Sequence, residues 1–492
     1  MSELELKLQV PRHQLSSLQS ELKRRGARSM PMLARYFDTT DGLLDRHGMS
    51  LRLRKEGRKW VQTLKTEGIS AVDRQEHSVP LRVATAQQPI LDLARHDSSD
   101  AGAALHKVLA EAGTHELVER YAVAVVRLSC ELRLPSAVVE AALDIGDVKA
   151  GNRVMPICEL ELEHKSGASR ELFALAKAWL DHGGLWLNTL SKSRRGSVLA
   201  NGHDHGPPFK AETPKLDRDL DGETMLRIIL QSVLRQVLGN ASELSSGSTS
   251  DEHVHQMRVG LRRLRTALRE FAPLSQGIDG EWEATLSDAF ARLGEVRDNE
   301  VVAKAVQPLL EQAHAPKVRW SMPDAEFDLL GVVRNAKLQG VLLDILAFAS
   351  GDGTPEASTS SSRRAQKHVV ARLSKLHQQV VKGGKRFVNL PPEDQHKIRK
   401  RLKRLRYLAE FVQTQWSDKA TQRYLQHLGP AQDALGAHND IAVAQDQFRK
   451  DAQEDPDALF AAGFLQAHLG VTAQAAHKAL KQVAGASRFW KR

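Results

Sequence analysis

The stretch Glu3-Leu-Glu-Leu-Lys-Leu-Gln-Val10 alternates charged or polar residues with apolar ones over its whole length. Successive side chains of a β-strand point to opposite faces, so Glu3, Glu5 and Lys7 would share one face and the leucines the other. A strand on the surface of an ordinary sheet has the same alternation. The stretch therefore predicts a strand with a charged face, and the rest of the sheet must decide what that face does.

The alternation recurs through the first 200 residues, as in Leu51-Arg-Leu-Arg54 and Cys158-Glu-Leu-Glu-Leu-Glu163. It predicts a sheet with one densely charged face and one apolar face. Two architectures can use such a sheet. In one, the charged face meets water and helices cover the apolar face. In the other, the sheet closes into a barrel with its charges inside, and helices at about 12–26 and 169–181 pack outside.

The kinds of charge on these strands favour the barrel. Buried charges are costly unless they are paired or bound to ions. The acidic strands offer hard oxygen ligands, which suit Mg²⁺ or Mn²⁺, and the basic strands offer Arg and Lys, which hold phosphate oxygens. A metal-bound triphosphate inside the barrel would meet both needs, because its metal would bind the acidic strands and its phosphate oxygens would bind the basic strands.

The segment Glu3-x-Glu5-x-Lys7 resembles the ExExK signature of the CYTH superfamily, the triphosphate tunnel metalloenzymes. Further segments follow in family order over about residues 1–200: Tyr36-Phe-Asp38, Leu51-Arg-x-Arg54, Thr63-Leu-Lys65, Arg74-x-Glu76, Asp144, the Glu159/Glu161/Glu163 strand and Ser191-Lys-Ser193. The resemblance implies a closed antiparallel β-barrel with flanking helices, and a metal-assisted attack of water on a terminal phosphoryl group.

The resemblance also implies roles for individual residues, and it leaves the general base open between the acidic residues and Lys7. Tyr36 is expected to be structural. The implied metal ligands are Glu3, Glu5, Asp144, Glu159 and Glu161, and Glu3, Glu5 and Lys7 are the catalytic candidates. The implied phosphate contacts are Lys7, Arg52, Arg54, Lys65, Arg133 and, as a further contact, Arg127, with Lys192 at a tunnel mouth.

From residue 224 onward the apolar period is that of helices, and the chain repeats itself. The segment His255-Gln-Met-Arg258-Val-Gly-Leu-Arg262-Arg-Leu-Arg265 aligns with His396-Lys-Ile-Arg399-Lys-Arg-Leu-Lys403-Arg-Leu-Arg406. The duplication predicts an all-α domain over 224–490, built of two repeated bundles at about 224–350 and 364–490. The turn-rich segment 201–223 is the expected linker between the halves, and 351–362 the expected link between the bundles.

Each repeated helix would carry a basic ladder beside an apolar stripe. At about 100° per residue the two ladders are His255, Arg258, Arg262 and Arg265, and His396, Arg399, Lys403 and Arg406. With Arg269 included, the first ladder spans roughly 20 Å, which suits an extended phosphate chain better than one small anion. A solvated helix face is the plainer alternative.

This half resembles the CHAD domain, a helical module with histidines and basic residues that often follows a CYTH domain. The resemblance covers about 224–490 and implies inorganic polyphosphate binding. Metal binding by the histidines has also been proposed for the family. We favour phosphate contact, because the surrounding arginines and lysines would repel a cation.

Composition narrows the remaining classes. The net charge of +10 makes a polyanionic partner plausible, and the two cysteines form no metal or disulfide motif. No apolar run is long enough for a membrane span, and the N-terminus does not read as a signal peptide. We therefore expect a cytoplasmic protein, with association with polyphosphate granules as a further expectation. Few aromatic residues and no base-reading motif argue against sequence-specific nucleic-acid binding, and the oligomeric state stays open.

The leading hypothesis is an inorganic triphosphatase with a polyphosphate-binding module. The tunnel scaffold also hosts class IV adenylate cyclases and thiamine-triphosphatases, and the sequence does not separate these from it. A non-catalytic protein that targets polyphosphate granules is a further alternative.

Overall fold

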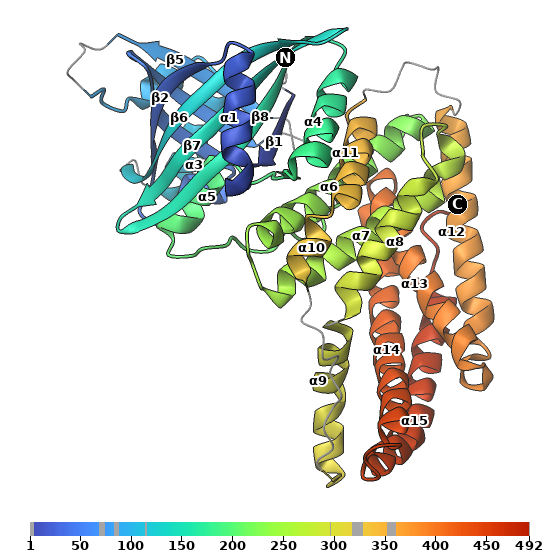
Figure 1. Cartoon of the computed structure of the whole chain (residues 1–492). Coiled ribbons are helices and arrows are strands. Elements are labelled where there is room, and N and C mark those ends of the chain that lie inside the picture. The colour runs from blue at the N-terminus through green and yellow to red at the C-terminus, as the bar shows by residue number, and fades with distance from the viewer. Residues whose placement is uncertain are drawn as a thin grey trace. The chain divides into compact units, whose positions relative to one another are not determined.

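The computed structural model describes residues 4–67, 74–82, 88–113, 116–295, 297–316, 328–351 and 361–491. Its first part is a single antiparallel sheet in the order β5-β4-β3-β2-β6-β7-β8-β1-β9 (Figure 1). The strands are β1 (Glu5–Gln9), β2 (Arg28–Asp38), β3 (Met49–Glu56), β4 (Lys59–Glu67), β5 (Arg74–Leu81), β6 (Val118–Arg133), β7 (Ala137–Ala150), β8 (Arg153–Gly167) and β9 (Trp186–Leu187). The predicted antiparallel β domain is thus confirmed.

The first strand lies in the predicted phase. Leu6 and Leu8 are 2% exposed or less, whereas Glu5 and Lys7 lie on the other face. β1 pairs with β8 in a register that sets Lys7 opposite Glu161 and Gln9 opposite Glu159. The ladder therefore brings Glu5 and Lys7 beside the acidic residues of β8.

The prediction of a closed barrel was wrong in one respect. Within the described residues, the sheet is not closed by hydrogen bonds: β5 and β9 are its two edges. The sheet curls, and helix α5 (Lys192–Ala200) packs on its inner face, where Leu199 joins Tyr36, Tyr121 and Val123 in one apolar cluster. The sheet ends at β9, a two-residue strand whose partner is β1. The charged face is therefore covered by the curvature of the sheet and by α5, and not by hydrogen-bonded closure of a barrel.

Helices cover the outer face, as predicted. α1 (Arg12–Arg24) contacts β6, and α4 (Arg170–Gly183) contacts β7 and β8. α3 (Asp100–Ala112) packs Leu105 and Leu109 against β3 and β4. Two short elements, α2 (Leu43–Arg46) and the 3₁₀ turn η1 (Leu93–His96), complete this part.

The remainder is helical, as predicted. Its elements are α6 (Gly222–Ser245), α7 (Asp251–Phe271), η2 (Ala272–Leu274), α8 (Glu281–Glu295), α9 (Arg297–Gln312), α10 (Leu329–Val333), α11 (Ala336–Ser350), α12 (Ser362–Gly384), η3 (Phe387–Asn389), α13 (Pro392–Val412), η4 (Gln413–Gln415), α14 (Asp418–Asp451) and α15 (Ala458–Gly485). The repeated motif lies on α7 and α13. Their apolar stripes are buried: Leu261 and Leu264 on α7, and Leu402 and Leu405 on α13, have no exposed surface.

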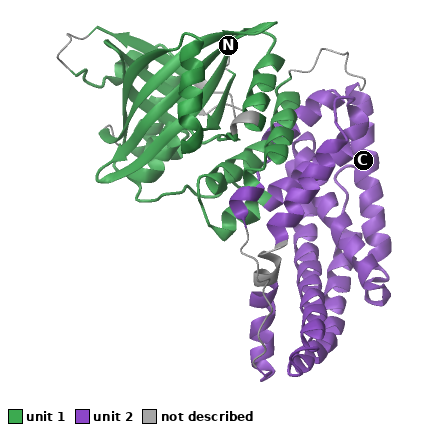
Figure 2. Ribbon diagram, viewed as in Figure 1, with its two compact units in different colours: residues 1–210, 234–257, 333–353 green, residues 211–233, 258–332, 354–492 purple. Residues whose placement is uncertain are grey.

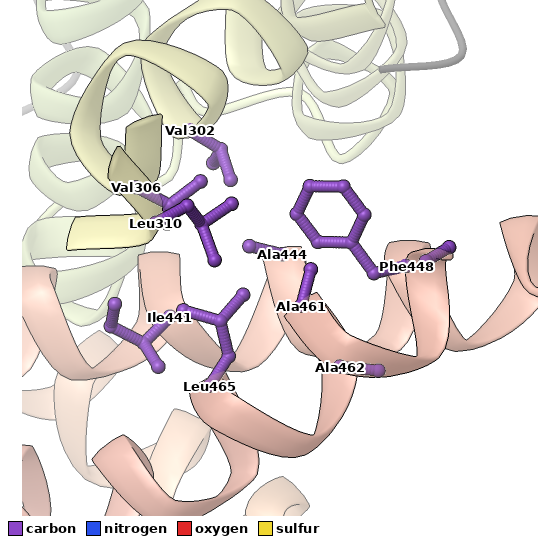
Figure 3. Packing of buried hydrophobic residues seen from close by; sticks show 10 residues of the cluster. Val302, Val306, Leu310, Ile441, Ala444, Phe448, Ala461, Ala462 and Leu465 are labelled. Atoms are coloured by element: carbon purple, nitrogen blue, oxygen red, sulfur yellow. The ribbon is translucent and has the colours of Figure 1, made fainter. Parts of the chain in front are cut away.

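One apolar cluster joins three of these helices. Val302 and Val306 of α9 pack against Ile441 and Phe448 of α14 and Leu465 of α15 (Figure 3). This cluster lies far along the chain from the basic ladders. Burial of this apolar surface helps to hold the three helices together.

The chain divides into two compact units, each made of several separate stretches of the sequence (Figure 2). The first unit contains 1–210 together with 234–257 and 333–353, and the second contains 211–233, 258–332 and 354–492. Polar contacts tie the helical pieces of the first unit to its sheet part. Lys177 Nζ lies 2.6 Å from Asp344 Oδ2, and the backbone N–H of Leu187 donates to Gln339 Oε1 at 2.9 Å.

The two predicted links differ in what the structure describes. Residues 201–221 contain turns and irregular backbone without helix or strand, whereas residues 352–360 of the second link lie outside the described residues. Among the described helices, none has the length and apolarity that a membrane crossing requires.

Candidate active site

A cavity of about 330 Å³ lies against the inner face of the sheet and the N-terminus of α5. Its volume is within the range of small-ligand sites. Seven cations and seven carboxylates are among its lining residues: Lys7, Arg52, Arg54, Lys65, Arg127, Lys165 and Lys192, and Glu5, Glu56, Glu76, Glu140, Asp144, Glu161 and Glu163. The lining is therefore rich in charge but balanced in sign.

Three carboxylates gather on one wall. Asp144 of β7 and Glu159 of β8 are register partners, and Glu161 lies two residues further along the same face. Each of the three offers a ligand oxygen within 4.8 Å of the others. The side chains of Asp144 and Glu159 are fully buried, so these negative charges need partners inside the protein.

Three cations supply those partners. Lys192 Nζ lies 2.7 Å from Asp144 Oδ2 and 2.7 Å from Glu161 Oε1, and it also pairs with Glu159. Arg127 donates from Nε and Nη2 to the two oxygens of Asp144, both at 2.7 Å, and it also reaches Glu161. Arg195 pairs with Glu159.

The ion pairs of this group shift the pKa values of Glu161 and Lys192 toward their charged forms. Burial opposes ionisation of Glu161, but Lys192 and Arg127 hold its pKa well below the usual value. Burial likewise opposes protonation of Lys192, but the three carboxylates raise its pKa above the usual value. Lys192 and Glu161 thus each favour the charged form of the other.

The other wall is cationic and comes from β3 and β4. Arg52, Arg54 and Lys65 project from alternate positions of these strands. Glu76 of β5 pairs with Lys65 and lies 3.8 Å from Arg52. Burial would raise the pKa of Glu76, but Lys65, Arg52 and a hydrogen bond from Ser78 lower it to about 2.

Tyr36 of β2 supports this wall. Its hydroxyl accepts a hydrogen bond from Arg52 Nη1 at 3.2 Å, and its ring stacks on Tyr121 with centroids 4.7 Å apart. The expectation that Tyr36 is structural fits this stacking, but the residue also lines the cavity.

The arginines and lysine of the basic ladders form a second group of charges, in the second unit, whereas His255 belongs to the first unit. Arg258, Arg262 and Arg265 of α7 surround the Phe290 ring, with guanidinium carbons 4.9, 5.0 and 5.8 Å from its centroid. Lys403 of α13 is crowded by cations. Burial, with Arg262, Arg399 and Arg258, lowers the pKa of Lys403 to about 6, although Asp440 acts in the opposite direction.

The ends of the ladders differ from the middle. Arg265 shares the Glu283 carboxylate with Arg269, and Arg406 pairs with Glu410 at 2.8 Å. Both ladder histidines are exposed; His396 Nδ1 lies 3.2 Å from Asn439 Oδ1. The crowding is therefore greatest where Arg262 and Arg399 approach Lys403.

Family models match both halves. The CYTH domain matches residues 1–197, and the CHAD domain matches residues 228–449. The chain carries a CYTH domain followed by a CHAD domain. The family resemblances seen in the sequence are thereby confirmed.

Individual relatives are distant. An inorganic triphosphatase of Haemophilus influenzae is 25% identical over 169 residues, which cover 34% of this chain and 45% of that protein. The match thus spans about half the length of this curated relative.

Solved structures are similar to each domain. The CHAD domain from the plant Ricinus communis aligns with 25% identity and a TM-score of 0.44, covering 57% of this chain and 98% of that one. A putative adenylyl cyclase from Hippeastrum, described as having a dominant triphosphatase activity, aligns at 17% identity and a TM-score of 0.28, covering 41% and 96%. A putative adenylate cyclase from Bacillus halodurans aligns at 18% and 0.29, covering 39% and 96%.

Most residues predicted for the CYTH site come together. Glu5, Lys7, Arg52, Arg54, Lys65, Arg127, Asp144, Glu161 and Lys192 line the cavity, and Glu159 completes the acidic cluster. Glu5 lines the cavity outside that cluster, 3.6 Å from Lys7. Glu3 lies outside the described residues.

Two predicted residues lie elsewhere than expected. Arg133 shares the face of Arg127 but lies six residues further along β6, roughly 20 Å for an extended strand, where it is exposed and does not line the cavity. Lys192 was expected at a tunnel mouth. Its ammonium instead lies among the three carboxylates of the acidic cluster. α5 places it there because Ser191 caps the helix, accepting from the backbone N–H of Arg194 at 3.0 Å.

Arg195 was missed by sequence reasoning. In Lys192-Ser-Arg-Arg195 the first and last residues are basic and lie three apart on a helix, and such residues share a face. That spacing could have indicated that Arg195 reaches the same carboxylates as Lys192. The Lys165 pairs with Glu140 and Glu163, at 2.8 and 2.7 Å, were also missed.

The acidic cluster fits a divalent cation. Its donors are all carboxylate oxygens, which Mg²⁺ and Mn²⁺ prefer. Ligands on opposite sides of such an ion are roughly 4 Å apart, which is compatible with the 4.8 Å limit of the cluster. Asp144, Glu159 and Glu161 are therefore the residues that would hold the metal.

Proposed function

We propose that the CYTH domain hydrolyses inorganic triphosphate with the help of Mg²⁺ or Mn²⁺. The observation that carries this proposal is the pairing of an acidic cluster with a cationic wall across one cavity. A chain of phosphates linked to metal meets both walls with complementary charge.

The residues divide the work by position. Arg52, Arg54, Lys65 and Lys7 bind phosphate oxygens and hold the terminal phosphoryl group in place, which stabilises the charge that spreads over its oxygens in the transition state. A metal held by Asp144, Glu159 and Glu161 would polarise the phosphoryl oxygens and lower the pKa of bound water.

An inorganic substrate is favoured by the lining. Among the described residues that line the cavity, Tyr36 is the sole aromatic, and its ring already stacks on Tyr121. An adenine or a thiazolium ring would therefore find little aromatic surface. This observation favours tripolyphosphate over ATP and thiamine triphosphate.

The test is a substrate comparison with the full chain. Tripolyphosphate, ATP and thiamine triphosphate are incubated with Mg²⁺ or with chelator, and released phosphate and cyclic AMP are measured. We expect rapid, metal-dependent loss of tripolyphosphate and much slower loss of the other two. Formation of cyclic AMP, or preferential hydrolysis of thiamine triphosphate, would replace the proposal with the corresponding alternative.

For the CHAD domain we propose binding of inorganic polyphosphate along the ladders of α7 and α13. The supporting observation is the gathering of Arg258, Arg262 and Arg265 around the Phe290 ring, with all three guanidinium carbons within 5.8 Å of its centroid. Like charges held this close favour a polyanion that neutralises several of them at once. Within the described part of the chain, neither Arg262 nor Lys403 forms an ion pair with a carboxylate.

Retention on immobilised long-chain polyphosphate tests this binding. The variant Arg262→Gln, Arg399→Gln, Lys403→Gln should elute at much lower salt than the unmodified protein, because fewer phosphates are neutralised. The control variant Lys450→Gln, Lys478→Gln, Lys481→Gln removes equal charge from exposed positions of α14 and α15 and should elute unchanged. Equal effects of both variants would refute a specific role of the ladders.

A further inference from the structure

The acidic cluster of the cavity carries its own counter-charge. Asp144, Glu159 and Glu161 contribute three negative charges, and Lys192, Arg127 and Arg195 contribute three positive ones. A divalent ion added to this group without any other change would leave a surplus of positive charge beside buried side chains. Such a surplus is costly in a protein interior.

Lys192 stands where the metal would be expected. Its ammonium forms ion pairs with all three carboxylates of the cluster, and those carboxylates are the metal ligands proposed above. A metal and the Lys192 ammonium therefore compete for the same oxygens. Removing Lys192 from the cluster would give it a net negative charge and make it a stronger metal site.

Lys192 is also the cation best able to leave. Arg127 is held by two hydrogen bonds to one carboxylate, and Arg195 does not line the cavity. Lys192 has a long flexible side chain on a backbone fixed at the first residue of α5, and it borders the cavity itself. Its ammonium can turn from the carboxylates to a phosphate oxygen without movement of the helix.

The charge of the whole cavity points the same way. Among the described residues that line the cavity, seven cations balance seven carboxylates. A polyphosphate anion alone would therefore add uncompensated negative charge, and a metal alone would add positive charge. The two together compensate each other. Metal and anion should thus favour each other's binding.

From this geometry we infer that Lys192 is an internal counter-ion that excludes the divalent cation until a phosphate chain draws its ammonium away. The inference rests on the proposed function for the identity of the anion. Lys192 is a positioning residue in this scheme. Its place in the cluster makes metal binding conditional on the anion.

The first experiment measures Mn²⁺ binding to metal-free full-length protein by calorimetry, without substrate. Lys192→Met should bind Mn²⁺ at least about tenfold more tightly than the unmodified protein, since close charge pairs commonly change equilibrium constants by this much or more. The matched control is Lys177→Met, which removes a lysine paired with Asp344 away from the cavity and should leave the affinity unchanged. An affinity in Lys192→Met that is equal to or weaker than that of the unmodified protein would overturn the inference.

The second experiment does not depend on a variant. Mn²⁺ binding to the unmodified protein is measured with and without a methylene-bridged triphosphate analogue, after subtracting the metal that the analogue binds in protein-free buffer. The analogue should tighten Mn²⁺ binding roughly tenfold or more, and Mn²⁺ should tighten analogue binding by the same factor. Independent binding of the two, with less than a twofold effect, would refute the inference even if Lys192→Met did not fold.

The two arms separate this inference from the proposed function. If the analogue does not bind with or without Mn²⁺, the triphosphate proposal fails. The competition between Lys192 and Mn²⁺ is still decided by the substrate-free titration. Thermal unfolding gives an additional readout, because Mn²⁺ should raise the melting temperature of Lys192→Met more than that of the unmodified protein.

Discussion

Arg127 and Arg133 illustrate what a single residue contributes to this site. Both project from β6 toward the same face, but Arg127 lies between Asp144 and Glu161, whereas Arg133 is exposed at the end of the strand. Alternation along a strand predicts the face of a side chain, and the sequence offered no measure of how far along that face the cavity extends. Alternation placed both residues on this face, and the family resemblance implied a phosphate contact for each.

The substitution Arg127→Gln should lower kcat/KM for tripolyphosphate by roughly 100-fold or more, because it removes a charged donor from the site and leaves Asp144 and Glu161 with one cation fewer. Steady-state phosphate release measures this. Arg133→Gln is the matched control on the same strand and should stay within about twofold. Equal losses in the two variants would contradict the placement of the cavity.

Lys403 gives the protein a specific pH dependence. Its pKa is lowered from 10.5 to about 6 by burial and by neighbouring arginines. Between these pH values the unfolded chain binds a proton that the folded chain does not, so this residue makes stability rise with pH from about 6 to about 10.5. Lys403→Met should therefore melt at a higher temperature than the unmodified protein at pH 6, with a difference that shrinks toward pH 10.

Thermal unfolding followed by circular dichroism at several pH values measures this difference. Lys478→Met, at an exposed position of α15, is the control and should show no such trend. If the melting temperatures of Lys403→Met and the unmodified protein changed with pH in parallel, the pKa of Lys403 would not be lowered in the folded protein.

Helix α5 is the element on which the site depends most. It sets Lys192 and Arg195 against the acidic cluster while its Leu199 packs on the inner face of the sheet. Gly196 makes this close approach possible, because a Cβ at that position would overlap the Tyr121 ring. The helix and the strand therefore meet with no room for a side chain.

Gly196→Ala should destabilise the protein by about 1–3 kcal/mol, the usual cost of overpacking, and lower triphosphatase activity by shifting Lys192. Differential scanning calorimetry and phosphate release measure the two effects. Gly470→Ala provides the contrast, because a Cβ at this helical position meets nothing within 4 Å. It should be neutral or slightly stabilising; a similar loss in both variants would disprove the close approach.

For helices and strands, the sequence predicted which kind of element forms, but it did not predict correctly how the strands pair at the ends of the sheet. Alternation identified the charged strands, and the repeated His-x-x-Arg motif identified α7 and α13 with their buried stripes. Local patterns do not report long-range pairing, so hydrogen-bonded closure of the barrel was predicted where the structure leaves β5 and β9 as edges. The role of α5 was missed for the same reason, since its partners are more than thirty residues away in the chain.

For the whole molecule, the two charged surfaces rest on different chemistry and should respond to different conditions. Chelator should lower the rate of tripolyphosphate hydrolysis by at least about 100-fold, because the proposed reaction needs a metal held by the acidic cluster. The same chelator should leave retention on polyphosphate unchanged. Raising salt from 50 to 200 mM should weaken retention strongly.

The same preparation of full-length protein serves both measurements, one by phosphate release and one by elution from immobilised polyphosphate. Loss of retention in chelator would indicate that a metal takes part in the CHAD interaction, as the proposal of histidine-bound metal in this family would require. Hydrolysis that persists in chelator would remove the metal from the proposed reaction.

The first compact unit draws on three separate stretches of the chain, 1–210, 234–257 and 333–353. The backbone of Leu187 and Thr189, beside the cavity, bonds to Gln339 and Ser242 from the later stretches. Cutting the gene at the apparent linker would therefore deliver a catalytic half that lacks part of its own wall. In chimaeras made from two related proteins, exchanging both domains together should preserve the fold far better than exchanging only one of them.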